Sequence, residues 1–118
     1  MITSDLFQRS DFACKCGCGF DAVDAELLQV LESVWRHFNQ RVEITSGCRC
    51  PLHNLSVGGS KRSQHLNGKA ADIMVAHTPP YVVAHYLEST YPDCYGVGQY
   101  HGHTHIDVRT DCARWDST

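Results

Sequence analysis

The segment Ser63-Gln64-His65-Leu66-Asn67-Gly68-Lys69-Ala70-Ala71-Asp72 joins a polar loop to an apolar stretch. Residues 70–75 are mostly apolar, a pattern that predicts a buried strand with one acid, Asp72, inside it. A buried carboxylate is costly unless something pairs with it, and a cation would do so. His65 lies seven residues earlier, in the loop. The segment therefore holds two candidate metal ligands.

A second group of candidate ligands lies further along the chain. His101, His103, His105 and Asp107 alternate, so their side chains share one face if the segment is extended. If this strand lies beside the strand of Asp72, the two groups converge. Two histidines and a carboxylate with one open position are typical of catalytic zinc, which lowers the pKa of bound water to about 7 and polarises a carbonyl. The pattern points to amide hydrolysis.

Simpler interpretations stay open at this point. Asp72 could cap a turn or pair with Arg49, Arg62 or Arg109. A single histidine in a loop is usually a solvated polar residue, which is the interpretation we favour for His37, His53, His77 and His85. Spacing alone does not decide between these interpretations and a metal site.

Hydrophobic periodicity in the rest of the chain predicts an α+β domain with a small antiparallel sheet and flanking helices. A helix is expected over residues 22–38, capped by Asp21 or Asp24. Residues 42–45 predict a strand, and residues 46–67 predict a long functional loop. Thr78-Pro79-Pro80 predicts a helix start with Thr78 as its cap. Residues 95–100 and 104–109 predict a hairpin.

Length and charge limit the classes of function. The chain has 118 residues, of which 42% are hydrophobic, and suits a single domain over residues 1–118. Ten basic residues against 13 acidic ones give a formal charge of -3, without a basic face for nucleic acid or a polybasic membrane patch. No apolar run approaches about 20 residues, and residues 1–9 lack the regions of a signal peptide. We expect a monomer made in the cytoplasm that neither spans a membrane nor binds nucleic acid.

Cysteine and histidine are frequent, with 7 Cys and 8 His. Because seven is odd, at least one thiol stays outside any intramolecular disulfide. Cys14, Cys16 and Cys18 lie in a Cys/Gly-rich N-terminal loop, residues 1–20. This cluster predicts a second, structural zinc or a disulfide strap, with Cys48 or Cys50 as further members. Three unligated thiols are the alternative.

Three segments resemble the motifs of one family. Residues 63–72 match SxHxxGxAxD at all five specified positions. Residues 96–100 and 105–109 resemble GxGxY and HxDxR, and residues 45–54 resemble TSGxRCPxHN. Together they resemble the zinc D-Ala-D-Ala carboxypeptidase-like metallopeptidases, related to the vancomycin-resistance D,D-dipeptidases and the hedgehog signalling domain. The resemblance covers residues 12–115 and implies the hedgehog/DD-peptidase-like fold.

The resemblance implies roles for single residues. His65, Asp72 and His105 would bind one catalytic zinc ion, with water as the fourth ligand. Arg49 would stabilise the substrate carbonyl oxygen or a carboxylate, and Ser63 would bind the terminal carboxylate or backbone of the peptide. The implied substrate is a stem or cross-link peptide of peptidoglycan, cleaved by a metal-activated water at a bond that involves D-alanine. The implied enzyme is a D,D-carboxypeptidase or endopeptidase of phage or prophage type, which a lysis or virion route would deliver to the cell wall.

The general base of the family pattern is missing from this sequence. Several relatives carry Asp or Glu shortly before the last zinc ligand, where this chain has Gly102, His103 and Thr104. His103 resembles the first histidine of the HxH arrangement in the hedgehog domain, so we predict His103 as base or transition-state donor, with His101 and Asp107 in reserve. The missing acid also supports a second hypothesis, a catalytically weak, zinc-stabilised module that binds cell wall or protein. A Cys-nucleophile hydrolase is a third, and it needs an exposed thiol of low pKa.

Overall fold

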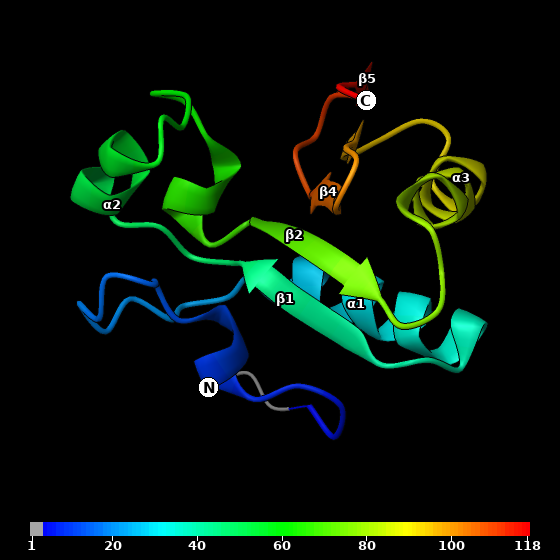
Figure 1. Ribbon diagram of the computed structural model, residues 1–118, viewed down its shortest axis with the longest axis horizontal. Helices are drawn as coiled ribbons and strands as arrows, with labels where there is room; N and C mark the ends of the chain where they lie inside the picture. Colours follow the sequence, from blue (N-terminus) through cyan, green and yellow to red (C-terminus); the bar gives the residue numbers. More distant parts are fainter. Residues whose placement is uncertain (1–3) are drawn as a thin grey trace.

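The structure, a computed structural model, describes residues 4–118, so residues 1–3 of the predicted N-terminal loop lie outside the described residues. The chain folds into the α+β architecture expected from the sequence (Figure 1). Its elements, with η marking a 3-10 helix, are η1 (Arg9–Phe12), α1 (Ala25–Phe38), β1 (Val42–Ser46), α2 (Pro51–Ser56), η2 (Gln64–Asn67), β2 (Ala70–Val75), α3 (Pro80–Thr90), β3 (Gly96–Gln99), β4 (Thr104–Asp107) and β5 (Ala113–Asp116).

The strands form one sheet in the order β1-β2-β4-β3-β5. The predicted hairpin is confirmed as β3 and β4, and the pairs β1–β2, β2–β4 and β4–β3 are antiparallel. The predicted small antiparallel sheet is extended by one parallel strand, because β5 pairs with β3 in parallel. The chain leaves β4 and returns on the other side of β3, so that β5 runs in the direction of β3. Residues 113–116 read Ala-Arg-Trp-Asp, an alternation of only four residues, which is too short to indicate a strand by itself.

Helix α1 begins three residues later than expected, because Asp24 caps it. The Asp24 carboxylate accepts hydrogen bonds from the backbone N–H groups of Glu26 and Leu27. The backbone N–H of Asp24 donates to the carbonyl of Gly68, 2.9 Å away. The start of α1 is thus attached directly to the loop that carries His65.

Two expectations for the other helices are corrected. The loop predicted over residues 46–67 contains α2 and η2, and Cys50 caps α2 by accepting a hydrogen bond from His53 N–H. Thr78 does not cap α3: Pro79 occupies the cap position, and the Thr78 hydroxyl donates to the carbonyl of Ala76 instead.

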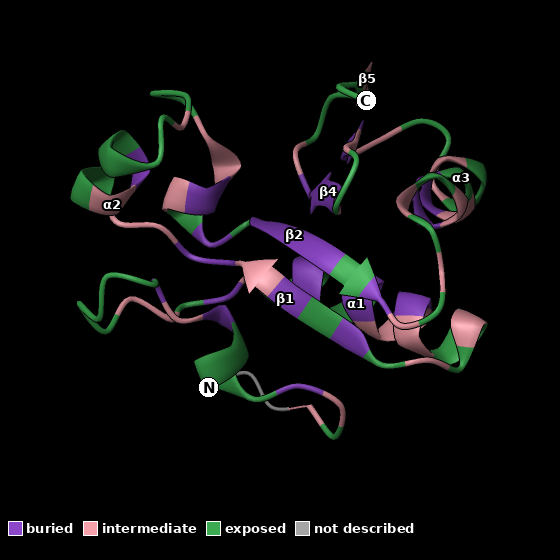
Figure 2. Cartoon of the chain, viewed as in Figure 1, coloured by how far each residue is buried: buried purple, intermediate pink, exposed green. Residues whose placement is uncertain are grey.

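The two faces of the sheet have different roles. Alternate residues of β2 and β4, such as Ile73 and Ile106, belong to the buried apolar cluster, to which α1 and α3 contribute Leu31 and Leu87. In Figure 1, α1 lies behind the β1–β2 pair, and Figure 2 shows the long buried stretch of β2. The remaining residues of these strands, including Asp72, point to the opposite face. That face carries the candidate site.

None of the helices within residues 4–118 combines the length and the apolar character that crossing a bilayer requires.

Candidate active site

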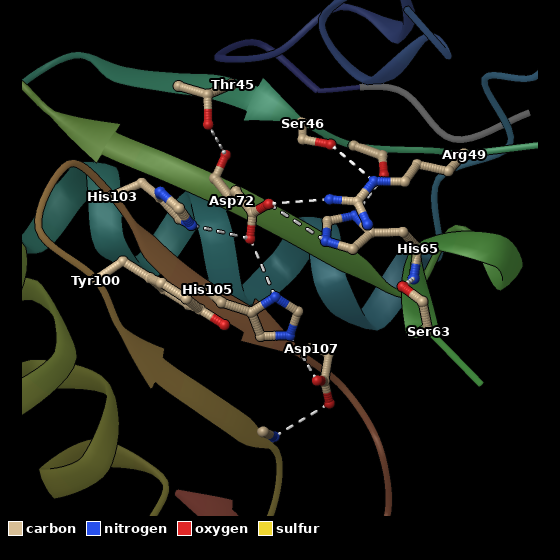
Figure 3. Close-up of polar contacts among 12 residues, drawn as sticks. Thr45, Ser46, Arg49, Ser63, His65, Asp72, Tyr100, His103, His105 and Asp107 are labelled. Carbon is tan, nitrogen blue, oxygen red and sulfur yellow. Dashed lines mark hydrogen bonds and ion pairs between the residues drawn. The ribbon is translucent and has the colours of Figure 1, made fainter. Parts of the chain in front are cut away.

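Three predicted metal ligands converge on the open face of the sheet, as Figure 3 shows. Asp72 lies in β2 and His105 in β4, and the antiparallel register pairs these two residues directly. His65 comes from η2, just before β2. The distance from His65 Nε2 to Asp72 Oδ2 is 3.4 Å, and that from His105 Nδ1 to Asp72 Oδ1 is 3.0 Å. All three residues are buried.

Hydrogen bonds at the far side of each imidazole fix which nitrogen faces the carboxylate. His65 Nδ1 lies 2.6 Å from the carbonyl oxygen of Gly47. A carbonyl only accepts, so Nδ1 carries the hydrogen and Nε2 faces Asp72 with a lone pair in the neutral ring. His105 Nε2 lies 2.7 Å from Asp107 Oδ2, so Nε2 donates there and Nδ1 faces Asp72. Such partners hold the tautomer and orientation of metal-binding histidines.

The buried carboxylates are held in their charged form. Burial by itself raises the pKa of Asp72, but hydrogen bonds with His105 and His65 hold that pKa well below its usual range. Burial likewise opposes ionisation of Asp107, and its contacts with Arg109 and His105 outweigh this and lower its pKa. Burial disfavours the charged form of His105, yet Asp107 and Asp72 raise its pKa above the ordinary value. Asp72 is therefore ionised at neutral pH, as a metal ligand must be.

The donor set fits a zinc ion. Zinc binds imidazole nitrogen and carboxylate oxygen at about 2.0–2.2 Å in a tetrahedron, whose edges are then about 3.3–3.6 Å. The histidine contacts of 3.0 and 3.4 Å run to the two different oxygens of Asp72, and one donor atom from each of the three residues lies within 4.8 Å of the others, so the three can share one ion. Three protein ligands leave one position open, the pattern of catalytic sites.

Arg49 is held beside these ligands. Its guanidinium donates from Nε to Ser46 Oγ at 3.2 Å and from Nη1 to Asn54 Oδ1 at 3.3 Å. The Nη2 atom lies 3.4 Å from Asp72 Oδ2, and the side chain is only 14% exposed. The backbone N–H of Arg49 donates to the carbonyl of His65, which fixes the two loops together. Arg49 is thus a half-buried cation that its neighbours hold in place beside Asp72.

The ligands lie in a cleft with a volume of about 590 Å³. One wall is aromatic, because Tyr100, His103 and Trp115 line it. The Trp115 indole donates to the Tyr100 hydroxyl at 2.9 Å and lies 5.1 Å from the His105 ring, centroid to centroid. Gly98 makes this arrangement possible, since a Cβ there would collide with the Trp115 indole. Gly96 is required for a similar reason, since a Cβ there would collide with the Asp107 carboxylate. Packing therefore explains both glycines of the GxGxY motif.

Ser63 also lines the cleft, as its predicted substrate-binding role requires. Its hydroxyl oxygen accepts a hydrogen bond of 3.2 Å from the backbone N–H of His65 and so caps η2. Ser63 therefore positions the turn that carries His65.

Of the three candidate bases, His103 lines the cleft, whereas His101 and Asp107 do not. His103 lines the cleft, with its Nε2 3.8 Å from Asp72 Oδ1 and its side chain 32% exposed. It stacks on Tyr100 with 4.4 Å between ring centroids and 14° between planes. His101 does not share this face: β4 begins only at Thr104, and a turn closed by the Tyr100 N–H to the His103 carbonyl breaks the alternation. His101 lines a separate small cavity.

Asp107, the other reserve base, is fully buried and lies under His105. Arg109 donates to it from Nε at 2.8 Å and from Nη2 at 2.7 Å, and the Gly96 backbone N–H also donates to it. Its carboxylate orients His105 and does not face the cleft. Of the residues lining the cleft, all within residues 4–118, only Asp72 carries a carboxylate.

Several contributors were not predicted from sequence. Trp115 and Tyr100 form the aromatic wall, and Gly47 holds His65 through its carbonyl. The glycine alternation of β3 is the signal that could have indicated a bulky group packed on that strand. Four histidines without a predicted role do not line the cleft: His37, His53, His77 and His85.

Comparison with known families agrees with the motifs. The chain matches the family model described as peptidase M15 over residues 5–107, and no curated protein matches it. This match confirms the resemblance to the zinc D-Ala-D-Ala carboxypeptidase-like metallopeptidases. M15 peptidases use zinc, and the matched range contains all three converging ligands, His65, Asp72 and His105. The chain therefore belongs to the peptidase M15 family of metallopeptidases.

Proposed function

We propose that this chain is a zinc-dependent peptidase that hydrolyses stem or cross-link peptides of peptidoglycan at a bond involving D-alanine. The observation that carries the proposal is the convergence of His65 Nε2, His105 Nδ1 and the Asp72 carboxylate inside an open cleft. Membership of the M15 family supports the reaction class. Delivery to the wall by a phage lysis or virion route is part of the same proposal and rests on the resemblance alone.

The charge of the cleft supports a substrate with a carboxylate. Arg49, Arg62 and Arg109 line the cleft, against the single carboxylate of Asp72. Arg49 and Arg109 already contact Asp72 and Asp107, whereas no carboxylate within residues 4–118 pairs with Arg62. Stem peptides end in a carboxylate, which an arginine fork recognises well. This charge pattern favours cleavage near a peptide's carboxyl end, and Ser63 lies among the lining residues as a further donor.

The residues of the cleft have distinct tasks in the proposed reaction. Zinc in such a site acts as a Lewis acid toward a carbonyl group and lowers the pKa of water to about 7. Arg49, already oriented by Ser46 and Asn54, donates hydrogen bonds to the oxygen on which negative charge develops. His103 reaches the cleft beside Asp72, accepts the proton of the attacking water at Nε2 and returns it to the leaving amine. Stacking on Tyr100 restricts the imidazole plane during this transfer.

One observation favours a second function. A carboxylate is the usual base in related enzymes, and Asp72, a ligand, is the only carboxylate that lines the cleft within the described residues. A zinc-stabilised module that binds cell-wall peptides without turnover would have this composition. A Cys-nucleophile hydrolase has no such support, because no cysteine of residues 4–118 lines the cleft.

Digestion of purified peptidoglycan separates the two functions. The proposal expects new amino termini or free D-alanine to appear with the zinc-loaded protein, to stop with a chelator and to return with added zinc. His65→Ala is the matched inactive variant. If the zinc-loaded wild type binds peptidoglycan but releases no product, the binding module is correct and the peptidase proposal is wrong.

A further inference from the structure

Four cysteines form a cluster outside the cleft. Cys14, Cys16 and Cys18 come from the N-terminal loop, and Cys50 comes from the cap of α2, more than 30 residues later. Their sulfur atoms all lie within 4.8 Å of one another. The separation is 3.4 Å between Cys14 Sγ and Cys16 Sγ and 3.6 Å between Cys16 Sγ and Cys50 Sγ. Cysteines that serve only as small apolar residues are usually buried, whereas Cys16 and Cys18 are exposed.

The spacing matches a tetrahedral thiolate site. Zinc binds cysteine sulfur at about 2.3 Å, so the sulfur atoms of such a site are about 3.8 Å apart. The backbone is shaped to bring alternate cysteines onto one point. Gly17 and Gly19 have φ of 83° and 92°, a left-handed conformation that glycine adopts without strain. The Gly17 N–H closes a turn on the Cys14 carbonyl at 3.1 Å.

Backbone donors also point at the sulfur atoms. The N–H of Cys50 donates to Cys14 Sγ at 3.4 Å, and the N–H of His53 donates to Cys50 Sγ at 3.4 Å. Hydrogen bonds from the backbone favour the thiolate form, which is the form that binds metal. The remaining cysteines are elsewhere: Cys48 is buried in the apolar cluster, and Cys94 and Cys112 belong to the region after α3.

We propose that Cys14, Cys16, Cys18 and Cys50 bind a structural zinc ion, separate from the site in the cleft. Four protein ligands leave no open position, which distinguishes a structural from a catalytic zinc site. Each thiol releases its proton to solvent as it binds, no redox change occurs, and four thiolates with one Zn²⁺ carry a net charge of -2. The sequence motifs left Cys48 and Cys50 as equal candidates for the fourth position, and the geometry selects Cys50.

The metal would fasten the N-terminal loop to the segment that builds the cleft. The Cys48 N–H already donates to the Phe12 carbonyl at 2.9 Å, and a Cβ on Gly47 would lie 2.9 Å from Phe12 Cα, closer than real contacts allow. The cluster adds a second attachment on the far side of Arg49. Arg49, which touches Asp72, lies between the two attachments, and Gly47, which orients His65, directly precedes the first. Because a metal that binds only the folded chain stabilises it, the cluster should stiffen this segment.

The test uses fully reduced, full-length His65→Ala protein, in which the cleft site is disabled. The proposal expects this variant to retain about one zinc ion per chain and to melt at a higher temperature with zinc than after chelation. Cobalt(II) in place of zinc should give the thiolate-to-metal charge-transfer band that nitrogen and oxygen ligands do not produce. The proposal does not depend on peptidase activity, and these readouts do not measure it.

Variants in the same background assign the ligands. Cys16→Ser/Cys18→Ser should lose both the zinc and the charge-transfer band, and the matched control Cys112→Ser should keep both. Cys18→His keeps four ligands, so it should retain zinc and shift the cobalt spectrum. This variant provides the test if the double variant does not fold. The proposal is overturned if folded, reduced His65→Ala protein takes up no metal, if it binds cobalt without the charge-transfer band, or if the folded double variant keeps its metal.

Discussion

His105 Nδ1 lies 3.0 Å from Asp72 Oδ1, directly across the pair of strands β2 and β4. The antiparallel register sets this contact, because it places both residues on the open face of the sheet while Ile73 and Ile106 fill the core. A slip of one residue would turn a ligand into the core. The same packing that stabilises the sheet therefore assembles two of the three candidate ligands.

His103 should act on the rate and not on the metal. If it transfers protons as proposed, His103→Gln should lower kcat by about 10²- to 10⁴-fold. Zinc content should stay the same, because His103 Nε2 is 3.8 Å from Asp72 and is not in the converging set. His101→Gln, two positions earlier but outside the cleft, is the control. Equal losses in the two variants would contradict the assignment.

Asp107 should strengthen the affinity of the cleft site for zinc. Asp107→Asn removes the charged acceptor of His105 Nε2–H, and the loss of such a partner typically weakens metal binding by about 10- to 100-fold. Chelator competition on folded protein measures the affinity, and kcat should recover at saturating zinc. Asp116→Asn, at an exposed carboxylate, should leave the affinity unchanged. Unaltered affinity in Asp107→Asn would show that this hydrogen bond is irrelevant to the metal.

Gly98 should be intolerant of any side chain. A Cβ there collides with the Trp115 indole, so Gly98→Ala should displace the indole and destabilise the fold by about 1–3 kcal/mol. Denaturant unfolding and tryptophan fluorescence report the two effects. Gly102→Ala is the matched control, because nothing lies within 4 Å of a Cβ at that position. Equal stability of the two variants would mean that the aromatic wall is not packed as described.

The alkaline stability of the fold should depend on Tyr95. Its hydroxyl donates to Glu26 Oε2 at 2.6 Å, and burial together with this hydrogen bond raises the pKa of Tyr95 above its ordinary value. A raised pKa means that the stabilisation is complete below about pH 10, the pKa of the unfolded chain, and is lost as pH rises toward the folded value. The free energy of unfolding should therefore fall by about 1 kcal/mol more in wild type than in Tyr95→Phe as pH rises above 10. Tyr81→Phe, at an exposed tyrosine, should behave as wild type does.

The core of the site could be predicted from the sequence because its signals are local. One acid inside an apolar strand needs a partner, His65 lies in the loop just before that strand, and His105 lies in an alternating segment. The structure brings these residues together with Arg49 and Ser63 around one cleft. The hairpin that carries His105 also followed from local pattern.

The rest depends on packing that local pattern does not encode. His101 leaves the predicted face because a turn, and not a strand, precedes Thr104. Asp107 is removed from the list of bases because Arg109 and His105 enclose it. Strand β5 is only four residues long, and its short alternation does not show that it pairs with β3 in parallel. Turn geometry, side-chain packing and strand pairing decide these outcomes, and they appear only in the folded chain.

Mass spectrometry of the products from defined stem-peptide muropeptides tests the central claim most directly. The zinc-loaded wild type should convert them to products that are shorter at a bond involving D-alanine. The reaction should stop with chelator, resume with zinc and be absent in His65→Ala. Intact muropeptides after incubation with folded, zinc-loaded wild type, or cleavage that continues undiminished in His65→Ala, would contradict a zinc peptidase built on His65, Asp72 and His105.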